Sequence, residues 1–415
     1  MAPLMNFVGK KLVDLYEFDL EKIYIFLMDV ADDPASFKIP DAESKKDRLR
    51  KIYRQMLTLC PLDKNDIDRV KNHVKAENYE PRKGNRLKGE IDKDFVPAQH
   101  IYRRQTGEQK PGTNTKPWAK IDVNLAPDWR HSYPYRPGVV ELPYWSHYDL
   151  LGLFLSLMGP AQPNSDRYNF FLPLTAVYTR WAFIIGGSRN YGDIKERSLQ
   201  EMAFTPKPGH GPPPTIFQCT WLEGSDGNVD FSLGASMGGH NYGNRQVLGD
   251  WGSKLQKTRF ALLNDWNGIK DSEWKNRKGE MVKFAFEISP SIDGGRSTTK
   301  FGNCGETYPF VHMLGTYRET SGRKQVKGLA LASAFLNIPA LREAYSLQDI
   351  LREENGRYKY LWAPCPNCRH LITVASAKLN NFLPKSNPPS PRDLEKGEGS
   401  KAKAEVKENG HLVSI

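Results

Sequence analysis

The first 80 residues of the chain are expected to be mainly helical, with apolar residues at helical spacing. In residues 10–28 they are close enough together to cover one broad face of a helix, formed by Leu12, Leu15, Phe18, Leu20, Ile23, Ile25 and Leu27. A charged segment, residues 42–59, is expected to form a second helix. The pattern therefore predicts a mainly helical N-terminal region.

The apolar segments farther along the chain are more varied. Helices are expected over residues 148–158 and 254–266, whereas residues 170–185 are compatible with either a strand or a helix. Residues 282–288 alternate between apolar and polar side chains, which is typical of a strand with one buried face. The chain is therefore expected to combine helices with sheet strands.

Proline, glycine and charged residues interrupt this pattern in three places. Residues 80–143 are rich in all of them and are expected to form long loops. In residues 205–215, TPKPGHGPPPT, each proline removes a backbone donor and fixes φ, so we place a boundary there. The end of the chain has the composition of a disordered tail. The resulting regions are a helical region with a basic, loop-rich segment (1–130), an accessory region (131–249), a third domain (250–383) and the tail (384–415).

Positive charge is in excess and unevenly distributed. The formal net charge is +11, and residues 81–120 contain ten Lys or Arg against four acids, with Phe95, Tyr102 and Trp118 among them. Such a mixture can follow a single-stranded backbone while the rings stack on bases, but it also fits a solvated loop with ordinary surface charge. Both interpretations stay open. On the first, single-stranded DNA or RNA contacts Arg82, Lys83, Arg86, Lys88, Arg103 and Arg104.

The cysteine content and the N-terminus bear on the compartment. Five cysteines, a small and odd number, do not suit a disulfide-built secreted protein. The N-terminus lacks the features of a secretory signal, and the apolar run 150–158 is far shorter than the roughly 20 residues of a membrane span. We therefore expect an intracellular protein, cytoplasmic or nuclear, that does not associate with a membrane. Cys60 and Cys219 stand alone and are expected to be packing residues.

The other three cysteines stand in two short motifs. GNCGETY, residues 302–308, places Cys304 two residues before Glu306, and WAPCPNCRH, residues 362–370, contains Cys365 and Cys368. Cysteines three apart in the first turn of a helix point to one side, and a helix N-terminus favours thiolates. With Cys304 as a third ligand from the start of another helix, the set would bind Zn²⁺ and leave its fourth position open, as catalytic sites do.

This pairing of C-x-E with P-C-x-x-C resembles the zinc-dependent deaminase superfamily of nucleosides and nucleic acids, and is closest in motif to toxin-type and fungal deaminase-like lineages. The resemblance implies an α/β fold, a three-layer α/β/α domain with a central mixed sheet over residues 250–383, including strands at 282–288 and 357–362. It also implies hydrolytic deamination of cytosine, favoured over adenine, as a free nucleoside or in a single strand. Glu306 would move the protons, and the backbone N–H of Cys365 would help hold the developing oxyanion.

Residues beside the motifs have two interpretations. Asn303 is a candidate substrate contact or a helix cap. Three thiolates and Zn²⁺ sum to a charge of −1, which Arg369 would offset unless it is an ordinary surface cation. In the alternative function, a zinc-stabilised interaction module, the metal needs a fourth ligand, for which His370 and His312 are the nearby candidates. A deaminase-like fold without activity is the third alternative.

Overall fold

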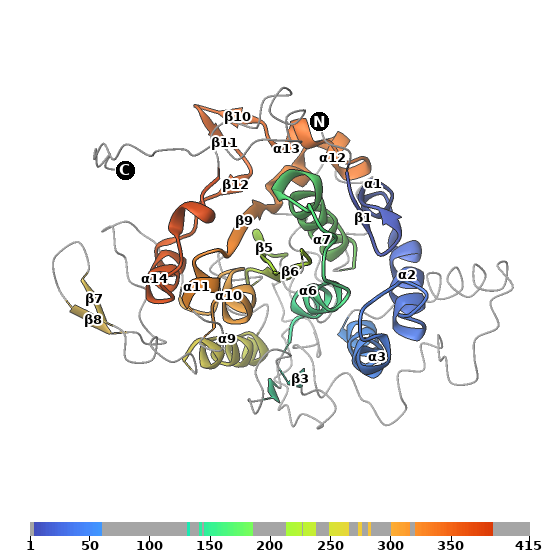
Figure 1. The fold of residues 1–415 in the computed structure, drawn as a ribbon, viewed down its shortest axis with the longest axis horizontal. Coiled ribbons are helices and arrows are strands. Elements are labelled where there is room, and N and C mark those ends of the chain that lie inside the picture. The colour runs from blue at the N-terminus through green and yellow to red at the C-terminus, as the bar shows by residue number, and fades with distance from the viewer. Residues whose placement is uncertain are drawn as a thin grey trace, which may run out of the picture.

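The central feature of the fold is a four-stranded sheet surrounded by helices (Figure 1). The prediction of a chain that combines helices with a sheet is confirmed at this level. The computed structural model describes residues 4–59, 131–132, 141–142, 145–185, 213–225, 227–237, 249–264, 273–275, 281–283, 300–315 and 320–384.

Helices make up much of the described structure. Their bounds are α1 Leu12–Tyr16, α2 Leu20–Asp32, α3 Ala42–Leu59, α6 His147–Leu157, α7 Leu172–Ile185, α9 Gly249–Asn264, α10 Thr307–Leu314, α11 Thr320–Arg323, α12 Pro339–Glu343, α13 Leu347–Ile350 and α14 Pro366–Val374. A π-helical turn, Arg167–Phe171, precedes α7, and 3-10 turns occupy Ser333–Asn337 and Leu379–Asn381. The predicted helices 42–59, 148–158 and 254–266 correspond to α3, α6 and α9, and the ambiguous segment 170–185 is helical.

The N-terminal apolar pattern forms two helices, α1 and α2. At the start of α2, the Asp19 side chain accepts a hydrogen bond from the backbone N–H of Lys22 at 2.9 Å. A carboxylate there begins a new helix, because it pairs one of the N–H groups that the first turn leaves without a partner. Phe18, in the break, stacks on Trp181 of α7 with ring centroids 5.9 Å apart, so the apolar face continues across the break.

The central sheet has the strand order β12-β9-β5-β6, and every neighbouring pair is antiparallel. Its strands are β5 Ile216–Glu223, β6 Val229–Ala235, β9 Lys327–Ala332 and β12 Leu361–Trp362. The prediction of a mixed sheet was therefore wrong for the described strands. The turn between β5 and β6 is too short for the crossover that parallel neighbours need, so this pair can only be antiparallel.

Helices pack against both faces of β5 and β6. On one face, Phe217 of β5 contacts Tyr178 of α7 with ring centroids 5.0 Å apart. Neighbouring residues of a strand face opposite sides, and Gly234 of β6, next to the residue that pairs with Phe217, lies against Pro309 of α10. The sheet is therefore enclosed between α7 and α10, and α10 follows the first cysteine motif.

The sheet takes strands from both sides of residue 250. β5 and β6 come from the predicted accessory region, and β9 and β12 from the predicted third domain. The segment 282–288 was expected in this sheet, but β8 Met281–Lys283 pairs instead with β7 Glu273–Lys275 in a separate hairpin. That expectation was wrong for the described part of the segment, because alternation of side chains indicates a strand without specifying its partner.

Three further hairpins lie outside the sheet: β1 Asn6–Phe7 with β2 Lys10–Lys11, β3 His131–Ser132 with β4 Glu141–Leu142, and β10 Glu353–Glu354 with β11 Arg357–Tyr358. Buried side chains from Phe7 to Phe382 form one continuous core. Among the described helices, none combines the length and apolar character needed to cross a membrane. Most of the predicted linker 205–215, and the predicted tail from residue 385 onward, lie outside the described residues.

Candidate metal centre

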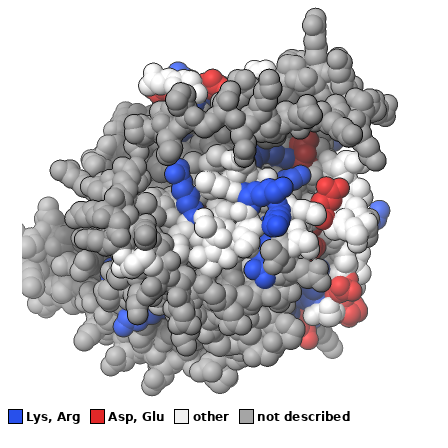
Figure 2. Space-filling model, turned by 60° about the vertical axis from the view of Figure 1, so that its left-hand side comes forward, with Lys and Arg blue, Asp and Glu red and all other residues white. Residues whose placement is uncertain are grey.

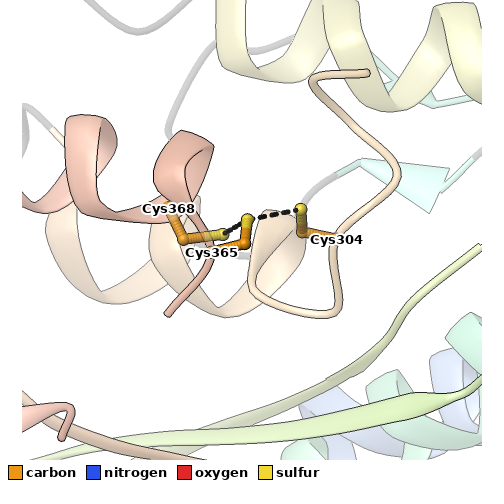
Figure 3. A group of neighbouring side chains, drawn as sticks. All are labelled: Cys304, Cys365 and Cys368. Carbon is orange, nitrogen blue, oxygen red and sulfur yellow. Dashed lines mark hydrogen bonds between the residues drawn. The ribbon is translucent and has the colours of Figure 1, made fainter. Parts of the chain in front are cut away.

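Three cysteine side chains converge, and they are the three that the motifs contain (Figure 3). The Sγ atoms of Cys304 and Cys365 are 3.3 Å apart, and those of Cys365 and Cys368 are 3.5 Å apart. Sulfur ligands at about 2.3 Å from a tetrahedral zinc lie roughly 3.8 Å from one another. The three thiols therefore stand close to the spacing that one zinc ion requires.

The start of α14 places two of the thiols. Cys365 is extended, with φ −64° and ψ 166°, and immediately precedes the helix, whose first residue is Pro366. Proline suits that position because its missing N–H would have no partner there. Cys368 lies in the first turn, fully buried, with its sulfur toward Cys365 (Figure 3). The predicted arrangement of these two cysteines is thus present.

The surroundings of Cys365 favour its thiolate. Hydrogen bonding with the thiols of Cys304 and Cys368, followed by bonds from the backbone N–H groups of Cys368 and Asn367, lowers the pKa of Cys365 well below its ordinary value. These N–H groups belong to the start of α14, where the helix carries a partial positive charge. Hydrogen bonding with Cys365 raises the pKa of Cys304, and burial raises the pKa of Cys368, so Cys365 is the first of the three to become a thiolate, the form in which sulfur binds metals.

Cys304 reaches the other two cysteines from the loop before α10. The prediction that Cys304 itself starts this helix was wrong, because α10 begins three residues later, at Thr307. Gly302 turns the chain with φ +88°, a left-handed conformation that glycine adopts readily. The Cys304 carbonyl then accepts bonds from the hydroxyl and the backbone N–H of Thr307, at 2.9 and 3.2 Å. Hydrogen bonds within the turn therefore set the local conformation of the loop that carries this ligand.

Glu306 lies beside the thiols and is only 5% exposed. Burial, followed by the charge of Cys365, raises the pKa of the Glu306 carboxyl to about 7. Hydrogen bonding with Cys368 and the positive charge of Arg259 act in the opposite direction. A carboxyl placed next to an open metal position can accept a proton and release it again.

Asn303 does not cap the helix. The residue before α10 is Glu306, and no side-chain hydrogen bond caps this helix. Asn303 Oδ1 instead accepts a hydrogen bond from Gln256 Nε2 of α9 at 2.8 Å. Its Nδ2 is buried and has no hydrogen-bond partner among the described residues, so both of its N–H donors stay available. The role of Asn303 as a substrate contact stays a prediction, as does that of the Cys365 N–H.

Neither candidate histidine joins the thiols in the described structure. His312 is buried within α10. His370 lies against Phe301 with ring centroids 6.2 Å apart, and burial lowers the pKa of His370 to about 4. Arg369 is exposed and donates from Nε to the Pro364 carbonyl at 3.0 Å, so it holds the loop before the second motif from outside.

Two charged residues at this site were not predicted from the sequence. Arg259 of α9 is fully buried and donates to the carbonyls of Gly302 and Cys304, and it forms an ion pair with Asp149 of α6 at 2.6 Å. The feature of the sequence that could have revealed them is the position of Asp149, an acid at the start of the long apolar run.

The two cysteines outside the motifs do not contribute to the described cluster. Cys219, expected as a packing residue, is fully buried in β5, and Cys60 lies outside the described residues.

The described surface on the α14 side of the molecule carries several basic side chains. Figure 2, which turns the α14 side of the molecule forward, shows lysine and arginine side chains grouped on the described part of this face. The exposed basic residues of the elements on this side include Lys324, Lys327, Arg369 and Lys378. Residues 355–384 contain no Asp or Glu. Arg82, Lys83, Arg86, Lys88, Arg103 and Arg104, the predicted nucleic-acid contacts, lie outside the described residues.

Gly234 controls how closely α10 approaches the sheet. A Cβ atom at this position would lie 2.6 Å from Pro309 Cδ and would also collide with the carbonyl oxygen of Gly305. We expect Gly234→Ala to lower the free energy of unfolding by about 1–3 kcal/mol, because the backbone of the cysteine loop has to move. Chemical denaturation measures the change. Gly322→Ala is the control, since a Cβ there meets nothing within 4 Å; equal stability of the two variants would contradict this packing argument.

In comparisons with known proteins, no family model matches this chain, and no curated protein or solved structure is significantly similar to it.

Proposed function

We propose that the protein is a zinc-dependent deaminase that acts on a nucleobase, with cytosine favoured over adenine. The observation that carries the proposal is a buried carboxyl, Glu306, that interacts with Cys365 and Cys368 of the three converged thiols. Both parts are needed. Thiols alone would also suit a metal that only stabilises the fold, whereas an adjacent carboxyl able to move a proton is what hydrolytic chemistry adds.

The thiols fit zinc in number, chemistry and spacing. Cys304, Cys365 and Cys368 supply three soft ligands from two separate elements, and Zn²⁺ binds four ligands in a tetrahedron. No fourth Cys, His, Asp or Glu completes the cluster within the described residues. When bound in such a site, zinc acts as a Lewis acid that lowers the pKa of water toward about 7.

Glu306 would carry the protons of the reaction. Hydrolytic deamination of cytosine consumes one water and releases ammonia, so both protons of the water must be delivered, one to the ring nitrogen and the other to the departing amino group. One carboxyl can perform both transfers if it lies beside the reacting atoms and is held in place. Glu306 meets the second condition. Its side chain is buried at the start of α10, and its backbone carbonyl accepts a hydrogen bond from the backbone N–H of Phe310 at 2.8 Å.

The alternative function, a zinc-stabilised interaction module, requires a fourth protein ligand on the metal. Structural zinc sites are closed by four protein ligands, and the histidines expected to supply the fourth do not join the cluster. The described residues therefore favour the open, catalytic type. A deaminase-like protein without activity would keep the same metal site and would differ only in turnover.

The test is ammonia release by zinc-loaded protein from a panel of cytidine, adenosine, single-stranded DNA, double-stranded DNA and RNA. We expect cytosine-containing single strands to be preferred over the free nucleosides, because the basic side chains on the α14 side of the molecule attract phosphates (Figure 2). The rate on a single strand should fall steeply as salt rises, while the rate on a nucleoside should not. Zinc-loaded protein that releases no ammonia from any member of the panel would contradict the proposed activity.

The basic segment predicted from the sequence can be tested in the same assay. Replacing Arg82, Lys83, Arg86 and Lys88 together by alanine is expected to weaken binding of a single-stranded oligonucleotide and to leave nucleoside turnover intact. Equal loss on both substrates would mean that the segment supports the fold. Turnover of nucleosides alone, insensitive to salt, would instead indicate a small-molecule deaminase.

A further inference from the structure

Arg259 lies behind the loop that carries Cys304 and is completely buried. Its Nη2 donates to the carbonyl of Cys304 at 2.7 Å and to the carbonyl of Ala235, the last residue of β6, at 2.9 Å. Its Nε donates to the carbonyl of Gly302. One guanidinium thus joins the end of a central strand to both sides of the turn that precedes α10.

The direction of this guanidinium is itself fixed. Its Nη1 contacts Asp149 Oδ1 of α6 at 2.6 Å, with both side chains 1% exposed. Ser146, at the start of α6, donates from Oγ to the other oxygen of Asp149 at 2.8 Å. The ring of Tyr308 lies on the remaining side, with its centroid 4.9 Å from Arg259 Cζ. Arg259 is therefore held by α6, β6, α10 and the cysteine loop together.

We propose that Arg259 is the positioning residue of the metal centre, which sets the place of Cys304 relative to Cys365 and Cys368. This inference rests on the proposed zinc site. Cys365 and Cys368 share one helix start, so their spacing is local, whereas Cys304 comes from a separate element and must be placed by contacts that are not local. The contact from Arg259 to the carbonyl of the ligand residue itself is such a contact.

The geometry also explains why an arginine occupies this place. The acceptors come from four directions that are not collinear, and the planar fork of a guanidinium has five N–H donors. A lysine has three donors on one atom and cannot reach carbonyls on both sides of the turn as well as Asp149. Arg259→Lys therefore keeps the positive charge but cannot form all of these hydrogen bonds at once.

A second arginine in this chain provides a matched control. Arg180 of α7 is also buried and donates to three carbonyls, those of Tyr16, Phe18 and Arg342, at 2.5, 2.6 and 2.7 Å. It also lies over a tyrosine ring, with its Cζ 5.4 Å from the Tyr16 centroid. Arg180→Lys removes the same kind of hydrogen bonds from residues that carry no zinc ligand.

The experiment compares zinc affinity by chelator competition in the full-length wild type, Arg259→Lys and Arg180→Lys, and records the absorption spectrum of each protein loaded with Co²⁺. We expect Arg259→Lys to weaken zinc binding about 10- to 100-fold, as other residues that hold metal ligands do, and to change the Co²⁺ spectrum. Arg180→Lys should lower thermal stability but alter zinc affinity by no more than about twofold, because the residues that its guanidinium contacts carry no zinc ligand.

A further variant covers the case in which Arg259→Lys does not fold. Asp149→Asn keeps Arg259 and an acceptor oxygen at position 149 but removes the negative charge that holds the guanidinium in place. This variant should weaken zinc binding at least about threefold. Unchanged zinc affinity and Co²⁺ spectra in the Arg259 and Asp149 variants would overturn the positioning role. So would equal losses in Arg259→Lys and Arg180→Lys, which would show a general effect of stability. A wild-type protein that binds no zinc would overturn the proposed metal site itself.

Discussion

Replacing Glu306 by glutamine is expected to abolish deamination and to leave the metal centre intact. Glutamine has nearly the same shape as glutamate but cannot carry a proton between water and substrate. General acid–base catalysis contributes about 10²- to 10⁴-fold to a rate, and Glu306 would serve two successive transfers, so a loss of several orders of magnitude is expected in kcat. Ammonia release at saturating substrate measures the loss.

Zinc content and thermal stability are the accompanying measurements for Glu306→Gln. The carboxyl is buried, and its burial disfavours the charged form, so a neutral amide should not destabilise the protein. Glu354→Gln is the control: this carboxylate is exposed and pairs with Lys359 at 3.0 Å on the surface, and its loss should leave the rate within about twofold. If Glu306→Gln retained more than about a tenth of the wild-type rate, the proton transfers would lie with another group.

The metal ligands could be predicted because most of their geometry is local. Cys365 and Cys368 lie three residues apart at a helix start, and Glu306 follows Cys304 by two residues, so short spacing alone brings each pair together. The structure places α14 and its proline as the spacing indicated. The start of α10 was misplaced by three residues, because the turn at Gly302 is held by tertiary hydrogen bonds that leave no periodic trace in the sequence.

The support behind the ligands could not be predicted in the same way. Arg259 and Asp149 are separated by 110 positions in the chain, and only the fold brings them into contact. Asp149 in an apolar helix signals a buried partner, since a buried carboxylate is costly unless it is paired. The sequence does not say which of the 59 lysines and arginines that partner is.

The helices could be predicted better than the sheet. Residues 42–59 and 148–158 showed their helical character through period and length, and both are helices. β5 was not identified, because a strand buried on both faces lacks the alternation by which strands are recognised. Strand pairing is decided by contacts between segments far apart, such as Cys219 of β5 opposite Leu329 of β9. The spacing of apolar residues along the sequence carries no information about such partners.

Replacing Cys304 and Cys365 together by serine is expected to remove the zinc and much of the stability of the protein. Wild-type protein should contain about one zinc per chain, measured by elemental analysis, because one complete ligand set exists among the described residues. Metal binding to the folded state contributes directly to the free energy of unfolding. Free zinc at about 1,000 times the dissociation constant stabilises a protein by about 4 kcal/mol, so the double variant, or chelation of the wild type, should lower the melting temperature markedly.

Cys219→Ala separates loss of metal from loss of a buried sulfur. Cys219 is fully buried in β5 and is not among the three clustered thiols, so this variant should lose about 1 kcal/mol through packing and keep its zinc. Chelation should then destabilise Cys219→Ala as much as the wild type, and should have no further effect on the Cys304→Ser, Cys365→Ser variant. Full zinc content in that double variant would falsify the assignment of the ligands. Only one of the three proposed ligands, Cys368, remains in this variant, and one thiol cannot hold zinc alone.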